Sequence, residues 1–240
     1  MTQLRELLNS AGWREFVLLL AVGALCGGIL IFIGVTDLVH EGEFHETEIA
    51  WMKGLRSPAD LARPIGPPWL ERWSLEITTL GGGAILTLST LLVAGYFLIQ
   101  RWYASTVLLL ISVAGGTLLT ILLKGYFDRE RPSVVPHLAD SLYQSYPSGH
   151  SMMSSVVYLT VAVLLSRAME HRKVKIYCVS AALFLSFIVG VSRVYLGVHY
   201  PTDVIAGWAG GIAWALLCWL TAFWLEKRGR VEPERARGAS

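Results

Sequence analysis

Histidines, an aspartate and several basic residues gather in three short stretches, and each stretch lies at the edge of a long apolar run. The stretches are KGYFDRERP at 124–132, PSGH at 147–150 and SRVYLGVHYPTD at 192–203. Charged and titratable groups are costly beside lipid, so this clustering needs a chemical reason. Cations together with imidazoles suit a pocket for a multiply charged anion, and a phosphate carried by a lipid is the simplest candidate.

The PSGH stretch predicts an anion site at the start of a helix. An apolar run follows Pro147, so we expect a helix to begin here with Ser148 as its cap. The free N–H groups of a helix start attract a phosphate, and Gly149 lets its oxygens approach the backbone. His150 can reach the same anion as a proton donor. The plain alternative is a helix cap with an incidental histidine.

The third stretch predicts an oriented imidazole. His199 and Asp203 are four residues apart, a spacing that lets the carboxylate hold one ring nitrogen and leave the other as a nucleophile. Pro201 disfavours a helix through His199, so the last helix is expected to start near Asp203. Arg193 supplies a planar fork that suits phosphate oxygens. The alternative is an interfacial His–Asp pair with a snorkelling arginine.

The first stretch contributes Lys124 and Arg131, the latter in an extended backbone because Pro132 follows it. Basic residues after a membrane span are ordinarily interfacial anchors. These two, however, lie on the side of the membrane that should be poor in lysine and arginine. Arg129 is close enough in sequence to be mistaken for either of them.

The composition indicates an integral membrane protein of one domain. Of its 240 residues 54% are hydrophobic and 16% charged, with a mean hydropathy of +0.52, whereas soluble proteins average about 25% charged residues. We expect an all-α bundle of about six transmembrane helices with short interfacial helices in the extracytoplasmic loops. The expected spans are Phe16–Thr36, Leu75–Ile99, Ala104–Leu123, Met152–Ser166, Ile176–Val194 and Val204–Leu225.

The sequence does not support a nucleic-acid partner, a disulfide framework or a signal peptide. The net charge of +2 comes with no basic patch interleaved with aromatics, so no nucleic-acid partner is expected. Cys26, Cys178 and Cys218 all fall in apolar spans, so no disulfide framework is implied. Arg5 and Arg14 precede the first span, but its apolar run is too long for a signal peptide and is expected to stay as an anchor.

The distribution of basic residues predicts the orientation. The richer side collects Arg5, Arg14, Arg101, Arg167, Arg172, Lys173, Lys175, Lys227, Arg228, Arg230, Arg235 and Arg237. The poorer side collects Lys53, Arg56, Arg63, Arg72, Lys124, Arg129, Arg131 and Arg193. The richer side should be cytoplasmic, and the expected location is a bacterial inner membrane. Both termini then lie inside and all three motifs face the extracytoplasmic side.

Residues 37–74 form a long connection with a helical pattern at Ile49, Trp51, Met52 and Leu55, followed by several prolines. We favour a connector packed on the bundle over a lid or a flank of the substrate entrance. His45 and Glu48 could hold zinc on a helix, but a solvated loop face is the preferred interpretation. His137 is likewise interpreted as a loop histidine. The glycines at 81–83, 115–116, 207 and 211 predict close helix contacts, and residues 226–240 a frayed tail.

In this order the three motifs resemble the signature of the type 2 phosphatidic acid phosphatase superfamily, K-x6-RP, PSGH and SR-x5-H-x3-D. No signature position departs from it. The resemblance extends to six spans with motifs after the third and fifth. The matching residues are Lys124, Arg131, Pro132, Pro147, Ser148, Gly149, His150, Ser192, Arg193, His199 and Asp203.

The resemblance implies a phosphohistidine mechanism with no cofactor. His199 would attack phosphorus, Asp203 would orient it, and His150 would protonate the leaving oxygen and then activate water. The phosphoryl oxygens would be held by Lys124, Arg131, Ser148, the Gly149 N–H and Arg193. Because cations of the protein take the place of metal ions, no metal is expected and activity should survive a chelator.

The motifs leave the substrate open. Undecaprenyl pyrophosphate is our first choice, because carrier lipids are recycled on that face, with phosphatidylglycerol phosphate or phosphatidate next. A lipid A phosphatase, a lipid phosphotransferase and a non-catalytic lipid-binding or transport protein are alternatives. The vanadate-dependent haloperoxidases share the signature, but six spans argue against halide oxidation. Oligomeric state cannot be predicted.

Overall fold

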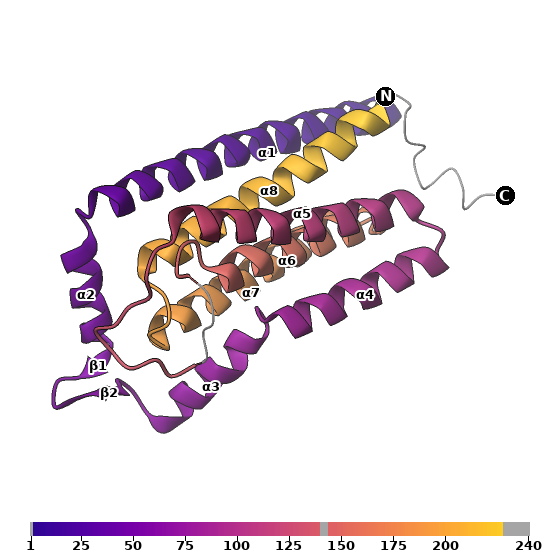
Figure 1. Ribbon diagram of the computed structural model, residues 1–240. Helices are drawn as coiled ribbons and strands as arrows, with labels where there is room; N and C mark the ends of the chain where they lie inside the picture. Colours follow the sequence, from indigo (N-terminus) through magenta and orange to yellow (C-terminus); the bar gives the residue numbers. More distant parts are fainter. Residues whose placement is uncertain (1, 140–143, 228–240) are drawn as a thin grey trace.

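The structure, a computed structural model, describes residues 2–139 and 144–227, and within them eight helices and a two-stranded hairpin (Figure 1). Five helices are long and apolar enough to cross a bilayer. They are α1 (Thr2–Glu41, apolar from Glu15), α5 (Tyr103–Phe127), α6 (Gly149–Ala168), α7 (Arg172–Tyr195) and α8 (Pro201–Lys227). Taken together, α3 (Pro68–Thr79) and α4 (Gly83–Ile99) are long and apolar enough for a sixth crossing. The predicted all-α membrane bundle of about six spans is confirmed.

The second span differs from its prediction as one continuous helix over Leu75–Ile99. It ends at Thr79 and restarts at Gly83, with a bend of 48° between the halves. A Cβ atom on Gly81 would lie 2.4 Å from the Val189 side chain and 3.2 Å from His150 Cβ. The glycines therefore mark a helix break as well as a close contact, because a run of glycine weakens a helix.

The close approach of α8 to α6 is confirmed at two glycines. A Cβ atom on Gly207 would lie 2.7 Å from the carbonyl oxygen of Ser148, and one on Gly211 would lie 2.4 Å from that of Met152. Any larger residue would push α8 away from the start of α6. These glycines therefore serve contacts within the chain and hold two of the motif-bearing helices together.

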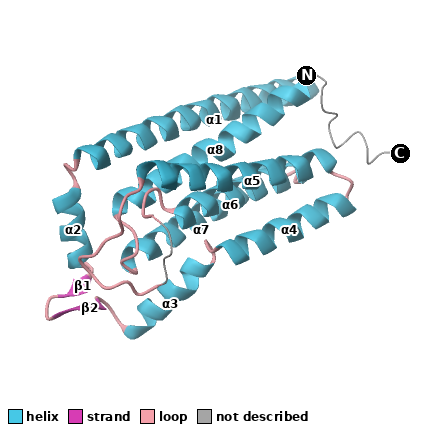
Figure 2. Ribbon diagram, in the orientation of Figure 1, coloured by secondary structure: helices cyan, strands magenta, loops and turns pink. Residues whose placement is uncertain are grey.

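One end of the bundle carries the long connections (Figure 2). It holds α2 (His45–Gly54), strands β1 (Arg56–Ser57) and β2 (Asp60–Pro64), and the loops after α5 and α7. The helical pattern predicted around Trp51 is confirmed by α2. The antiparallel hairpin is a small addition to the all-α prediction, and Pro68 begins α3 as its first residue.

The opposite end carries the short α4–α5 and α6–α7 connections and the far ends of α1 and α8 (Figure 1). Arg101, Arg167, Arg172 and Lys173 belong to these connections or their flanks. The frayed tail was expected from residue 226, but α8 continues to Lys227. Residues 228–240 and the side chains of Arg5 and Arg14 lie outside the described part of the chain.

Candidate active site

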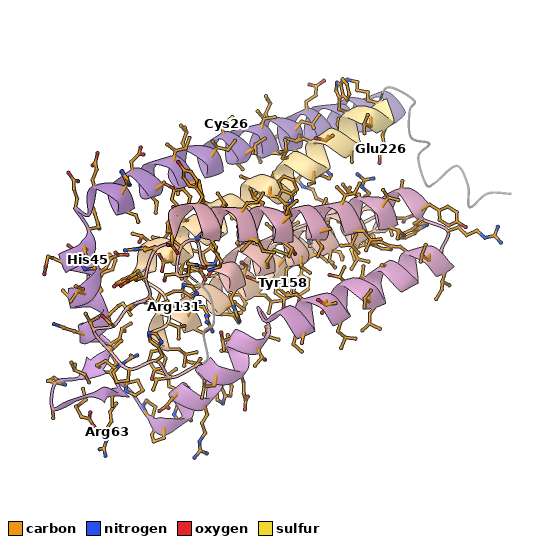
Figure 3. The ribbon with its side chains drawn as sticks, viewed as in Figure 1. Cys26, His45, Arg63, Arg131, Tyr158 and Glu226 are labelled. Atoms are coloured by element: carbon orange, nitrogen blue, oxygen red, sulfur yellow. The ribbon has the colours of Figure 1, made fainter. Side chains whose placement is uncertain are left out.

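Backbone hydrogen bonds draw the three motifs together at the end with the long connections. The Ser148 N–H donates to the carbonyl of Asp203 at 2.9 Å, which joins the second motif to the third. The Ser145 N–H donates to the carbonyl of Arg129 at 2.8 Å, which joins the residues before the second motif to the first. Motifs separated by many residues therefore share one small volume, as the sequence predicted. Arg131 is labelled there in Figure 3.

His199 is buried, with 1% of its surface exposed, in the turn between α7 and α8. Its Nδ1 lies 3.4 Å from Asp203 Oδ2, and its Nε2 lies 3.3 Å from Arg131 Nη1. A guanidinium can only donate, so Nε2 must accept and the ring proton belongs on Nδ1, facing the carboxylate. The Nε2 lone pair therefore points toward the basic residues, as a nucleophile aimed at a bound anion would.

The surroundings of His199 keep its ring neutral. Burial lowers the pKa of His199 well below the ordinary value of about 6.5, although the carboxylate of Asp203 acts in the opposite direction. Arg131 and Arg193 add to the lowering. Since only the neutral imidazole has a free lone pair, the side chain is ready to react at neutral pH.

Asp203 is held from several directions. It is fully buried, and its Oδ1 accepts from Arg129 Nη1 at 2.6 Å. Its Oδ2 accepts from Ser145 Oγ at 2.5 Å and from the Tyr200 N–H at 2.9 Å. One oxygen is thus fixed by the cation, while the other is turned toward His199. The carboxylate can orient the imidazole, because its own rotation is restrained.

Three basic side chains converge on this volume: Lys124 from α5, Arg131 from the loop after α5, and Arg193 from α7. Lys124 Nζ donates to the Gln144 carbonyl at 2.5 Å, and Arg131 Nη1 donates to the Val198 carbonyl at 2.6 Å. Arg193 is 2% exposed, and its Nη1 donates to Thr78 Oγ1 at 2.9 Å. Within residues 2–139 and 144–227, Lys124 and Arg193 form no ion pair with a carboxylate, and Arg193 Nε has no hydrogen-bond partner. Their charge is available to an anion.

The start of α6 contributes backbone and hydroxyl donors. Ser148 occupies the predicted cap position, but its side chain makes no capping hydrogen bond. Its Oγ instead accepts from Ser151 Oγ at 3.0 Å, which leaves its own hydrogen for another acceptor. A Cβ on Gly149 would lie 3.5 Å from Lys124 Cε, so the lysine runs beside the glycine backbone. The first N–H groups of α6 and the lysine ammonium thus face one region.

His150 and Arg193 line a cavity of about 820 Å³. His150 lies in the first turn of α6, next to Gly149 and close to the α3–α4 break, where a Cβ atom on Gly81 would lie 3.2 Å from the His150 Cβ. The other walls come from the α3–α4 break and from the loop after α5. The lining residues are Leu75, Thr78, Thr79, Gly82, Gly83, Ala84, Ile85, His137, Leu138 and Ala139, beside His150 and Arg193.

Two interpretations of the long connection need correction. Glu48 is 1% exposed, so the solvated face is wrong for this residue. The zinc alternative has no support either, because both carboxylate oxygens are taken by Arg129 and Thr202. In the described ranges no group of three or more His, Cys, Asp or Glu could hold a metal ion. His137 Nε2 donates to the Pro132 carbonyl at 2.6 Å, as a loop histidine would.

Four residues near the site were not found from the sequence: Glu48, Thr78, Arg129 as a partner of Asp203, and Ser145. Arg129 takes the place of neither Lys124 nor Arg131, because it forms ion pairs with two carboxylates. The pairing of Arg193 with Thr78 depends on the end of α3. Their partners are far away in the chain, and no local spacing could have revealed them.

Comparisons with known proteins agree with this geometry. The sequence pattern described as the PAP2 superfamily matches residues 105–227, just over half of the chain and all three motifs. Phosphatidylglycerophosphatase B of Bacillus subtilis is 35% identical over 153 residues, which cover 62% of this chain and 73% of that protein. A lipid A 1-phosphatase of Rhizobium johnstonii is 34% identical over 164 residues, covering 59% of this chain and 63% of that protein.

A solved structure has the same fold. It is the crystal structure of a transmembrane PAP2 type phosphatidylglycerolphosphate phosphatase from Bacillus subtilis. The TM-score is 0.75 at 27% identity, and the match covers 84% of this chain and 96% of that chain. The likeness therefore includes the helices that position the site as well as the motifs.

Proposed function

The chain belongs to the PAP2 superfamily of membrane lipid phosphatases, and we propose that it cleaves a lipid phosphate through a phosphohistidine intermediate. The observation that carries the proposal is the orientation of His199. Its Nε2 lone pair points at Arg131, 3.3 Å away, while Nδ1 faces Asp203. An imidazole held in this way can attack a phosphorus atom whose oxygens the neighbouring cations bind.

In the first step His199 Nε2 forms a bond to phosphorus as the bond from phosphorus to the lipid oxygen breaks. His150, which this step requires to be protonated in the substrate complex, gives its proton to that leaving oxygen. Lys124, Arg131 and Arg193 hold the phosphoryl oxygens with the Ser148 hydroxyl and the Gly149 N–H. Charge spreads over those oxygens in the transition state, so fixed cations accelerate the reaction.

In the second step water releases the phosphate. His150, now neutral, takes a proton from a water molecule whose oxygen attacks phosphorus. The phosphorus–nitrogen bond breaks, His199 regains its lone pair, and inorganic phosphate leaves. The same histidine thus acts as acid and then as base, which requires it to lie beside the leaving oxygen and the water in turn.

Two lipid phosphates are supported as candidate substrates. Phosphatidylglycerol phosphate is suggested by the likeness to phosphatidylglycerophosphatase B. Undecaprenyl pyrophosphate remains the candidate predicted from the outward-facing site. The cavity beside His150 has apolar walls from Leu75 and Ile85 and polar walls from Thr78 and His137, which suits a headgroup joined to a lipid chain. Purified lipid phosphates assayed in parallel and ranked by kcat/KM will identify the substrate.

We place the protein in a bacterial inner membrane with the chain ends in the cytoplasm and the site outside. The support is the collection of basic residues at the end of the bundle opposite the motifs. Fusing a reporter that is active only in the cytoplasm to the C-terminus tests this placement. A fusion that is inactive, together with an active periplasmic reporter at the same position, would reverse the orientation.

The mechanism is tested by trapping the intermediate. Enzyme quenched during turnover of a labelled lipid phosphate should carry label that is stable in alkali and lost in acid, as a phosphoramidate is. His199→Ala should abolish both the label and turnover, while His150→Ala should lengthen the life of the label because its hydrolysis is slowed. Wild-type turnover in His199→Ala would overturn the nucleophile assignment.

The cations of the chain should make a metal unnecessary. We expect turnover in excess chelator to stay within about twofold of turnover in untreated enzyme, since Lys124, Arg131 and Arg193 supply the positive charge. Measuring initial rates before and after chelation checks this. A loss that one divalent metal restores would contradict it.

A further inference from the structure

The interfacial helix α2 reaches the candidate active site through one buried carboxylate, Glu48. Its Oε2 accepts from Arg129 Nη2 at 2.6 Å. Its Oε1 accepts from the Thr202 N–H at 3.1 Å and from Thr202 Oγ1 at 2.5 Å. Thr202 lies in the first turn of α8, so a side chain from α2 caps the helix that carries Asp203 and complements its dipole.

Arg129 joins the two carboxylates. Its Nη1 donates to Asp203 Oδ1 at 2.6 Å and to Thr202 Oγ1 at 2.8 Å, while Nη2 donates to Glu48. The guanidinium lies 4.2 Å from the centre of the Tyr200 ring, and the side chain is 15% exposed. Because a guanidinium is planar and rigid, it fixes the two carboxylates relative to one another.

This arrangement holds one side of the Asp203 carboxylate, while Ser145 Oγ and the Tyr200 N–H hold the other. With Oδ1 bound to Arg129, Oδ2 is left to face Nδ1 of His199. If Arg129 lost its contact with Glu48, Nη2 of its fork would be unanchored, and Asp203 Oδ1 would be held less firmly although Ser145 and Tyr200 still bind Oδ2. Buried ion pairs contribute little net stability compared with apolar packing, so a role in stability alone explains this network poorly.

We propose that Glu48 is a positioning residue for the phosphoryl transfer, acting through Arg129 to hold Asp203 and thereby the imidazole of His199. The inference rests on the proposed function, since it presumes that His199 is the nucleophile. It assigns α2 a part in catalysis, whereas the sequence suggested a connector. Glu48 hydrogen-bonds to Arg129 and Thr202, and neither belongs to the predicted phosphate site.

The test is Glu48→Gln in the purified full-length protein. Glutamine has the same shape, and its oxygen can still accept from Thr202, but its amide would face the Arg129 donors and lose that bond. The matched control is Glu46→Gln, the same change on the same helix at an exposed position. Arg129→Lys keeps the charge but cannot bridge both carboxylates.

We expect Glu48→Gln to lower kcat about 10- to 100-fold, as the loss of an outer partner does at other sites. KM and the inhibition constant of inorganic phosphate should stay within about twofold, because the cations that bind phosphate are untouched. Glu46→Gln should match the wild type. The double variant Glu48→Gln/Arg129→Lys should be no slower than the slower single variant, since both changes break one chain of contacts.

Three results would overturn the proposal: a wild-type kcat in Glu48→Gln, a parallel loss of kcat and phosphate binding, or additive effects in the double variant. Size-exclusion profiles and melting curves establish that each variant is folded. His199→Ala, assayed alongside, separates the two hypotheses. If it is inactive while Glu48→Gln is normal, only the positioning role fails; if it is active, the proposed mechanism itself fails.

Discussion

The two ends of the bundle differ in how deeply their ion pairs are buried. At the end with the long connections, Glu48, Arg129 and Asp203 form ion pairs with side chains that are 2%, 15% and 0% exposed. At the other end Arg167 pairs with Glu226, and these side chains are 26% and 25% exposed. Figure 3 shows Arg131 and Glu226 far apart along the bundle, one toward each end.

The difference indicates where charge serves chemistry. Removing a charge from water is expensive, and a buried pair recovers that cost only with good geometry and further hydrogen bonds. Partly exposed pairs near a membrane surface cost little and contribute little. Changes to charged residues at the end with the long connections should therefore alter turnover. Matched changes at the opposite end should leave turnover intact.

After His199→Ala, which should abolish turnover, the largest expected effect comes from His150→Ala. We expect kcat to fall about a thousandfold for a lipid alkyl phosphate, because the leaving oxygen loses its proton donor. The loss should shrink for an aryl phosphate, whose leaving group needs no proton. Rates for a series of leaving groups measure this, with His171→Ala at the other end as the control. A loss independent of leaving-group pKa would assign the acid to another residue.

Arg193→Lys should have the next largest effect. The charge is kept, but an ammonium cannot hold Thr78 and also present a planar fork to phosphate oxygens. We expect kcat/KM to fall about a hundredfold, comparable to the loss of one transition-state donor elsewhere. The same substitution at exposed Arg101 is the matched control. Near-normal kcat/KM in Arg193→Lys would mean that charge alone is sufficient there.

At the end with the long connections, the sequence predicted two kinds of residue. They are residues whose partners are near in the chain and residues that belong to a signature motif. His199 and Asp203 lie four apart and do face each other, at 3.4 Å. Ser148 does occupy the start of a helix. The length of each apolar run was enough to predict the spans, since crossing a bilayer sets a minimum length. Catalytic roles for these residues remain predictions, because geometry alone does not show turnover.

The supporting residues could not be predicted, because their partners are distant in the chain. Glu48 and Thr202 are 154 residues apart, and Arg193 and Thr78 are 115 apart. Only the folded arrangement of α2 and α3 against the motifs brings them together. The Glu48 carboxylate, in a stretch rich in acidic residues, has the pattern of a solvated loop until its burial is known.

The helix break at Leu80–Gly82 is a different case, since the sequence did contain its signal. Three consecutive glycines at 81–83 predict weak helix as readily as close packing, and both occur. The break turns the first residues of α4 toward the cavity that His150 lines.

The smallest effect is expected at the second end. Glu226→Gln removes one partner of Arg167, and it leaves no fully buried charge behind because both side chains are about a quarter exposed. We expect the free energy of unfolding to fall by about 0.2–1 kcal/mol, as for other exposed pairs, and kcat/KM to stay within about twofold. Unfolding in mixed micelles and a parallel assay measure the two quantities.

If turnover fell as far as in Glu48→Gln, the contrast between the two ends would be wrong, because charge far from the phosphate site would then matter equally. If only stability fell, by about 3 kcal/mol or more, the pair would behave as a buried one and the contrast would hold for catalysis alone.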